Sequence, residues 1–210
     1  MKSIKHFIWD FDGTLVDTYP NITSYLQKAL RDFGYEVSQT DILEQMLVTI
    51  PHAKKYYAEL YSIEFEKLNE RYSYHDKAGA DNVSYPFPDV LEVLKRIREL
   101  GGKNYVFTNR GASVYPMLER VGLIDEFDEI VSASDESFVS KPAPDSILYL
   151  MKKYGGTCED TAMVGDRQLD LSSAYAAGCK TIHLVTPSVP QQLVCDWRIM
   201  NFAEMLDLLK

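Results

Sequence analysis

The chain has 210 residues, a formal net charge of -9 at pH 7 and a sequence pI near 4.9. This net negative charge argues against nucleic acid as the main partner, because binding to a phosphate backbone needs clustered Lys and Arg. No apolar run reaches the roughly 20 residues that cross a bilayer, so no membrane association is expected. Three cysteines, Cys158, Cys179 and Cys195, form no zinc or disulfide pattern and favour reduced thiols in a cytoplasmic protein.

The first part of the chain predicts one strand followed by helices. Residues 4–9 (I-K-H-F-I-W) predict a strand that ends at two acids, Asp10 and Asp12. Apolar residues at helical spacing predict a helix over residues 18–33. Residues 38–79 keep a helical character and contain no convincing strand. The first strand is therefore expected to be followed by a helical insert.

After residue 84, predicted strands and helices alternate. The predicted strands are 104–108, 129–132, 161–165 and 180–185. The predicted helices are 88–100, 112–121, 144–154, 168–177 and 201–209. Such alternation implies right-handed crossovers and a parallel sheet with helices on both faces. The predicted fold class is therefore α/β, with the helical insert between the first strand and the rest.

Chemically active side chains follow four of the predicted strands, at the sheet edge where ligands collect. They are Asp10, Asp12, Thr108, Asn109, Arg110, Lys141, Asp166 and Asp170. Four carboxylates that converge there cannot all stay ionised without a cation, and hard oxygen ligands suit Mg²⁺. Asp166 and Asp170 have i,i+4 spacing, so one helical turn would bring them to the same face. Acids are also favourable at a helix start, so capping stays an alternative role for Asp170.

The same set supplies what phosphoryl transfer needs besides a metal. Lys141 precedes Pro142, which favours an extended backbone and would aim the ammonium in a fixed direction. Thr108 and Asn109 offer a hydroxyl, an amide and backbone N–H donors for phosphate oxygens. A nucleophilic carboxylate, a cation, a lysine and such donors act by positioning and charge neutralisation.

The stretches D-F-D-G-T-L-V-D, T-N, K-P and G-D-R-Q-L-D, in this order, closely resemble the four motifs of the haloacid dehalogenase (HAD) superfamily. By appearance, the most similar branch is the phosphoglycolate phosphatase-like group of small-molecule phosphatases. The resemblance covers the whole chain and implies a Rossmann-like, doubly wound parallel sheet over residues 1–16 and 85–210. It further implies that residues 17–84 form an inserted α-helical cap of the C1 type.

This resemblance also implies roles for the motif residues. Asp10 would attack phosphorus to form an aspartyl phosphate, and Asp12 would protonate the leaving oxygen and then activate water. Mg²⁺ would be held by the Asp10 side chain, the Asp12 main-chain carbonyl and Asp166, with Asp170 acting directly or through water. Four residues would contact the phosphoryl group: Gly13, Thr108, Asn109 through its backbone, and Lys141.

Three further side chains are candidates for substrate contact on weaker grounds. Arg110, just past the second motif, could reach a substrate anion. His52 and Lys54 follow a helix break in the insert and could face the active site, although solvated charges beside a turn explain them equally simply. Trp9, beside the first acid, is expected in the core.

An aspartate two residues after the nucleophile marks phosphatases and phosphomutases in this superfamily. The leading hypothesis is a Mg²⁺-dependent phosphatase that hydrolyses a small phosphorylated metabolite, as a cytoplasmic monomer or homodimer. A phosphomutase with the same core stays open, because that choice depends on cap closure and on contacts to a second hydroxyl. A receiver-type signalling domain is normally near half this length and has no cap. A binding protein that lost activity would not be expected to keep every motif position.

Overall fold

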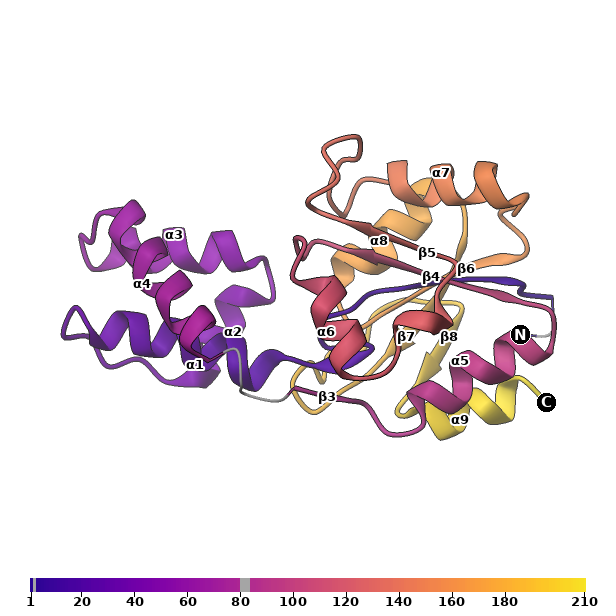
Figure 1. Ribbon diagram of the computed structural model, residues 1–210, viewed down its shortest axis with the longest axis horizontal. Coiled ribbons are helices and arrows are strands. Elements are labelled where there is room, and N and C mark those ends of the chain that lie inside the picture. The colour runs from indigo at the N-terminus through magenta and orange to yellow at the C-terminus, as the bar shows by residue number, and fades with distance from the viewer. Residues whose placement is uncertain (2, 80–83) are drawn as a thin grey trace. The chain divides into compact units, whose positions relative to one another are not determined.

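The computed structural model describes residues 1, 3–79 and 84–210. In these ranges the chain divides into two compact units, Met1–Asp17 with Tyr85–Lys210, and Thr18–Ser84. We call the first the α/β unit and the second the helical unit (Figure 1). The division predicted from the sequence fell after residues 16 and 84.

The α/β unit is built on a parallel sheet, in which the described residues form six strands in the order β5-β4-β1-β6-β7-β8. The strands are β1 (His6–Trp9), β4 (Lys103–Thr108), β5 (Glu129–Ser132), β6 (Thr161–Gly165), β7 (Lys180–Leu184) and β8 (Trp197–Ile199). From the central β1, the sheet extends to β4 and β5 on one side and to β6, β7 and β8 on the other. The carboxyl end of β1 is therefore a topological switch point, where α/β proteins bind ligands.

Helices cover both faces of this sheet (Figure 1). The helices on one face are α5 (Val90–Glu99), α6 (Val114–Arg120) and α9 (Phe202–Leu208), and on the other α7 (Asp145–Tyr154) and α8 (Gln168–Ala177). A short 3₁₀ helix, η1 (Ile124–Glu126), precedes β5. Alternation along β1 explains the two layers, because Phe7 and Trp9 join one buried cluster while Ile8 joins the other. The predicted α/β fold class and the placement of Trp9 in the core are confirmed.

The sequence did not predict three short strands. β8 extends the sheet at one edge, and β2 (Val16–Asp17) pairs in antiparallel fashion with β3 (Tyr85–Pro86). Segments of two or three residues carry no measurable hydrophobic period, so a sequence pattern cannot reveal them. The β2–β3 pair joins the points at which the chain leaves the α/β unit and returns to it.

The helical unit contains the helices α1 (Tyr19–Arg31), α2 (Gln39–Met46), α3 (Ile50–Leu60) and α4 (Phe65–Ala78). Side-chain caps start two of them, because Ser38 Oγ accepts from Asp41 N at 3.1 Å and Thr49 Oγ1 accepts from His52 N at 3.0 Å. The expected helix break falls just before Pro51, which lies in the first turn of α3. In the described ranges, no helix is both long enough and apolar enough to span a bilayer.

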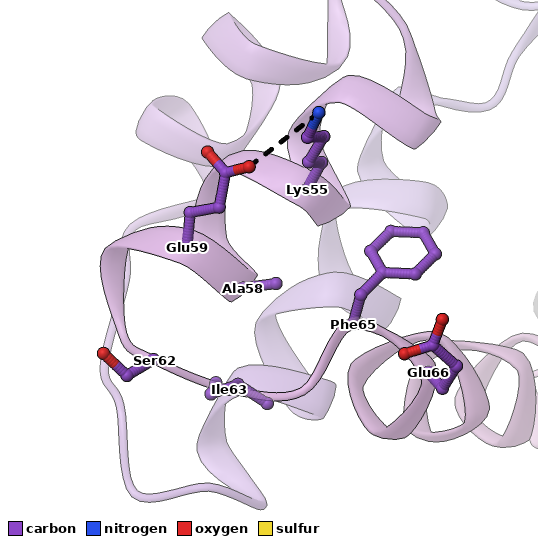
Figure 2. Close-up of a pocket in the computed structure, with 7 residues that line it drawn as sticks. All are labelled: Lys55, Ala58, Glu59, Ser62, Ile63, Phe65 and Glu66. Atoms are coloured by element: carbon purple, nitrogen blue, oxygen red, sulfur yellow. Dashed lines mark ion pairs between the residues drawn. The ribbon is translucent and has the colours of Figure 1, made fainter.

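An open pocket of about 580 Å³ lies within the helical unit, where α3 ends and α4 begins (Figure 2). Its described lining residues are Lys55, Ala58, Glu59, Ser62, Ile63, Phe65 and Glu66. Lys55 and Glu59 form an ion pair of 3.9 Å on its rim, and both side chains are largely exposed. Of the described residues that line this pocket, none belongs to the predicted site.

The packing of α7 on the sheet can be tested with two leucines of the same helix. Leu150 is 1% exposed in the core cluster, whereas Leu148 is 46% exposed. We expect Leu150→Ala to lower the free energy of unfolding by about 2–5 kcal/mol, because it leaves a cavity. Leu148→Ala should change it by less than about 0.5 kcal/mol. Urea denaturation measures both, and equal effects would contradict the assigned face of α7.

Candidate active site

The carboxyl edge of the sheet in the α/β unit carries the predicted acids together with Thr108 and Lys141. Asp10 and Asp12 follow β1, Thr108 ends β4, and Asp166 follows β6. Lys141 lies in the segment between β5 and α7. Because all these strands are parallel, their carboxyl ends meet at one edge, as the sequence predicted.

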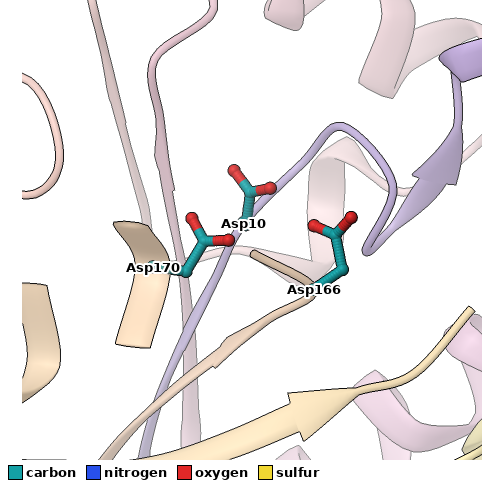
Figure 3. A group of neighbouring side chains, drawn as sticks. All are labelled: Asp10, Asp166 and Asp170. Carbon is teal, nitrogen blue, oxygen red and sulfur yellow. The ribbon is translucent and has the colours of Figure 1, made fainter. Parts of the chain in front are cut away.

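Asp10, Asp166 and Asp170 form a buried carboxylate cluster (Figure 3). One carboxylate oxygen of each lies within 4.8 Å of the others, and all three residues are fully buried. The pairing of β1 with β6 continues past the strand, since Asp10 N donates to Val164 O at 2.9 Å. Asp170 lies in the first turn of α8. A Cβ on Gly165 would overlap the Asp170 side chain, so only glycine leaves room for this arrangement.

Lys141 provides the positive charge of the cluster. Its Nζ donates to Asp10 Oδ1 at 2.5 Å and to Asp170 Oδ1 at 2.5 Å, and its side chain is fully buried. Burial lowers the pKa of Lys141, but the charges of Asp10 and Asp170 outweigh burial and raise the pKa above its ordinary value. The side chain is therefore an ammonium at neutral pH.

The Asn109 side chain holds the backbone of Lys141. Asn109 Oδ1 accepts from Lys141 N at 2.8 Å, and Asn109 Nδ2 donates to Lys141 O at 3.1 Å. The Lys141–Pro142 peptide bond is cis. Sequence reasoning assigned Asn109 a backbone contact to phosphate and missed this side-chain role, because the two residues are 32 positions apart. The paired hydrogen bonds fix the end of β4 to the loop that presents the lysine.

Asp10 combines burial with one uncommitted oxygen. Burial, followed by the charge of Asp170, raises the pKa of Asp10 from 3.8 to about 6, against the opposing charges of Lys141 and Arg167. Among the described residues, no donor is hydrogen-bonded to the buried Oδ2 atom. Arg167 Nη2 lies 3.7 Å from Oδ2.

This donor set fits a hard divalent cation. The buried Oδ2 of Asp10 has no hydrogen-bond partner among the described residues, and Asp10 belongs to one cluster with the Asp166 carboxylate. Buried polar atoms are almost always satisfied, so an orphan oxygen of this kind indicates a missing ligand such as an ion. Carboxylate oxygens are the ligands that Mg²⁺ prefers in proteins. The cluster therefore matches the Mg²⁺ that the sequence predicted.

Two residues that the sequence interpretation did not assign to the site hold Asp166. Thr14 Oγ1 donates to Asp166 Oδ1 at 3.2 Å. His183 Nε2 donates to the main-chain carbonyl of Asp166 at 3.2 Å, and burial lowers the pKa of this histidine. Thr14 lies within D-F-D-G-T, so its proximity to the acids was a usable signal. His183, on β7, offered none.

Both oxygens of Asp170 are occupied within the protein. Oδ1 accepts from Lys141, and Oδ2 accepts from the backbone N–H of Arg167 at 3.0 Å, at the start of α8. The second bond is the helix-capping contact that sequence analysis kept as an alternative. Asp170 therefore caps α8 and orients the lysine at the same time.

Asp12 has a different partner, the guanidinium of Arg110. Arg110 Nε donates to both Asp12 carboxylate oxygens at 3.1 Å, and Nη2 donates to Oδ1 at 2.6 Å. The Arg110 backbone N–H donates to Thr108 Oγ1 at 3.0 Å. The contact between Arg110 and a substrate anion stays a prediction, and the structure gives this arginine a protein partner that the sequence did not indicate.

Gly13 shapes the turn after the two acids. It has a φ of +80°, which a residue with a side chain adopts only with strain. Its N–H donates to Val16 O at 2.9 Å, closing the turn before β2. Gly13 therefore has a conformational role in this turn, and its contact with phosphate stays a prediction.

His52 and Lys54 lie on α3 of the helical unit, and each has a partner there. His52 Nε2 lies 3.2 Å from Gln45 Oε1. Lys54 Nζ donates to Asn69 Oδ1 at 2.6 Å and lies 5.0 Å from the centre of the Tyr72 ring. Substrate contact by either residue stays a prediction.

Comparison with known proteins decides the family. The family model of haloacid dehalogenase-like hydrolases matches residues 7–184. The chain belongs to the haloacid dehalogenase-like hydrolase family. A phosphoglycolate phosphatase of Aliivibrio fischeri is 30% identical, over 87% of this chain and 85% of its own length. One of Haemophilus influenzae (strain 86-028NP) is 28% identical, over 96% of each chain.

A solved structure extends the likeness to the fold. The crystal structure of a predicted phosphoglycolate phosphatase from Haemophilus somnus 129pt has a TM-score of 0.85 at 23% identity, covering 100% of both chains. The family match and the two phosphatase relatives confirm the resemblance to the superfamily and to its phosphoglycolate phosphatase-like group. In this hydrolase, the four sequence motifs meet at one edge of the sheet.

The raised pKa of Asp10 predicts a stability change that depends on pH. The folded state holds this proton more tightly than the unfolded state, so stability falls as the pH rises from 3.8 to about 6 and Asp10 ionises. In EDTA above pH 6, the free energy of unfolding of Asp10→Asn should be higher than that of the wild type by up to about 3 kcal/mol. Lys141 keeps Asp170 as a partner in this variant. Near pH 4, the free energies of unfolding of the variant and the wild type should converge.

Urea denaturation across this pH range measures the difference. Asp125 is exposed, so Asp125→Asn is the matched control and should show no such trend. An Asp10→Asn protein that is less stable than the wild type at pH 8 would contradict the electrostatic account of the cluster.

Proposed function

We propose that this hydrolase transfers the phosphoryl group of a small phosphorylated metabolite to Asp10 and then to water. The chain is a phosphoric monoester hydrolase, as the family match and the phosphatase relatives indicate. The observation that carries the proposed mechanism is the state of Asp10. One of its oxygens is bound by a buried lysine, and the other has no hydrogen bond among the described residues.

Asp10 is the proposed nucleophile. In the first half-reaction, an Asp10 carboxylate oxygen forms a bond to phosphorus while the bond from phosphorus to the ester oxygen breaks. The ammonium of Lys141 keeps Asp10 in place and offsets its charge and part of that of the phosphoryl group. The Thr108 hydroxyl and the Asn109 backbone N–H are the proposed donors to phosphoryl oxygens.

Asp12 is the proposed acid and base. It gives a proton to the leaving ester oxygen in the first half-reaction. In the second, it accepts a proton from the water that attacks the aspartyl phosphate, and the bond between phosphorus and Asp10 breaks to release inorganic phosphate. Its side chain is 11% exposed, which is compatible with proton exchange between turnovers.

The family generally uses Mg²⁺, and we propose that this chain holds it through the side chains of Asp10 and Asp166 and the main-chain carbonyl of Asp12. Asp170 would act through Lys141 rather than as a direct ligand, because both of its oxygens already accept hydrogen bonds. When bound, Mg²⁺ would supply positive charge to the phosphoryl oxygens.

The substrate we propose is a small phosphomonoester that carries a carboxylate, with 2-phosphoglycolate as the first compound to assay. Support comes from the relatives named phosphoglycolate phosphatase. We further propose that the helical unit acts as the cap, because it is inserted directly after the turn that carries Asp10 and Asp12. A cytoplasmic monomer or homodimer is proposed, and the free Cys158, Cys179 and Cys195 agree with a reducing compartment.

A phosphatase screen tests the function. Purified protein with Mg²⁺ is offered a panel of phosphorylated metabolites that includes 2-phosphoglycolate and sugar phosphates, with released phosphate as the readout. Hydrolysis of at least one phosphomonoester is expected. An isomerised sugar phosphate without phosphate release would favour the phosphomutase instead, and no conversion of any compound would contradict the proposal.

Removal of the proposed nucleophile should abolish turnover. We expect Asp10→Asn to lower kcat with 4-nitrophenyl phosphate by about 10³-fold or more, the scale found when a nucleophile is removed. Asp125→Asn, an exposed aspartate of the same unit, should keep wild-type activity. Full activity of Asp10→Asn would overturn the mechanism.

The metal proposal can be tested without turnover. Mg²⁺ should raise the melting temperature of the wild type, because a ligand that binds only the folded state stabilises it. We expect Asp166→Asn to lose most of this shift and Asp125→Asn to keep it. Calorimetric titration with MgCl₂ provides the affinity. An unchanged shift in Asp166→Asn would contradict the assignment of this residue as a ligand.

A further inference from the structure

We propose that Arg110 is a positioning residue that orients the carboxylate of Asp12 for proton transfer at the ester oxygen. The inference deepens the phosphatase mechanism and rests on it. It assigns the arginine a task in the reaction itself, in place of the contact to a substrate anion that the sequence suggested.

The first ground is the geometry of the pair. Arg110 Nε bridges both oxygens of Asp12 at 3.1 Å, and Nη2 lies 2.6 Å from Oδ1. Contacts to both oxygens fix the plane of the carboxylate as well as its position, which a single ammonium could not do. The two side chains are only 12% and 11% exposed, so solvent screens the pair far less than a surface ion pair.

The second ground is that Arg110 is itself held firmly. Its backbone N–H donates to Thr108 Oγ1 at 3.0 Å, and its carbonyl accepts from Ala133 N at 2.9 Å. Its Nη1 donates to Ser113 Oγ at 3.3 Å, and the guanidinium carbon lies 5.6 Å from the centre of the Phe11 ring. A long side chain restrained at both ends can act as a template for its partner.

The third ground is the position of Asp12 in the chain. It lies in a turn that bends at Gly13, with a φ of +80°, and not within a helix or a named strand. A side chain on such a turn gains little restraint from its own backbone. Proton transfer needs the donor within hydrogen-bond reach of the leaving oxygen. The guanidinium contacts to the Asp12 carboxylate come from Arg110, two residues after the end of β4 at Thr108.

Leaving groups of different basicity separate this role from the alternatives. Phenyl phosphate and 4-nitrophenyl phosphate have nearly the same shape, but phenolate is the poorer leaving group and depends more on a proton from Asp12. The readout is kcat/KM, which reports the first half-reaction. A third substrate, 2-phosphoglycolate, adds a carboxylate that an arginine could bind directly.

For Arg110→Gln we expect kcat/KM with phenyl phosphate to fall by about tenfold to hundredfold, the scale of a misplaced acid. With 4-nitrophenyl phosphate the loss should be less than about threefold, and Arg110→Lys should recover part of the activity. Asp12→Asn should show the same dependence on the leaving group. Adding Arg110→Gln to Asp12→Asn should cause little further loss with phenyl phosphate, because both changes act through one group.

Other outcomes overturn the inference in distinguishable ways. Equal losses on both aryl esters would make Arg110 a structural or phosphate-binding residue, and a loss confined to KM for 2-phosphoglycolate would make it a substrate-carboxylate contact. Wild-type protein that hydrolyses none of the three would contradict the phosphatase mechanism itself. Arg96 is a partly exposed arginine on α5 that pairs with Glu99, so Arg96→Gln is the control and should match the wild type on all three substrates. Circular dichroism verifies that each variant is folded. If Arg110→Gln does not fold, the same comparison of leaving groups is made with Arg110→Lys.

Discussion

The candidate active site depends on a lysine ammonium that is buried between two aspartates. Lys141 Nζ lies 2.5 Å from a carboxylate oxygen of Asp10 and 2.5 Å from one of Asp170, and none of the three side chains is exposed. Burying an ion costs several kcal/mol unless it is paired and hydrogen-bonded. The buried ammonium therefore needs a carboxylate partner, and the surrounding chain brings Asp10 and Asp170 to the same point.

The fold meets this requirement with rigid elements. β1 and β6 are neighbours in the sheet, so Asp10 and Asp166 emerge side by side. Asp170 comes from the first turn of α8, and Gly165 leaves the space that its side chain occupies. Lys141 comes from a loop, but two hydrogen bonds from Asn109 tie that loop to the end of β4.

The charges of this cluster do not balance, and the imbalance has functional value. Three buried carboxylates face one lysine, with Arg167 near Asp10 and Asp166. Burial first, and then the negative charge of Asp170, raises the pKa of Asp10. A buried cluster with excess negative charge favours binding of a divalent cation. Active sites commonly carry such a cost in stability.

The sequence by itself determined the α/β class, the order of the motifs and the residues at the strand ends, because parallel strands all finish at the same edge of a sheet. It also led to Asp10, Asp166, Asp170 and Lys141 as one group. Only the tertiary structure decided their partners. Arg110 meets Asp12 across 98 positions, and Thr14 meets Asp166 across 152. Such pairs depend on side-chain orientation and loop paths, which leave no periodic pattern in the chain, and strands as short as β2 and β3 leave none either.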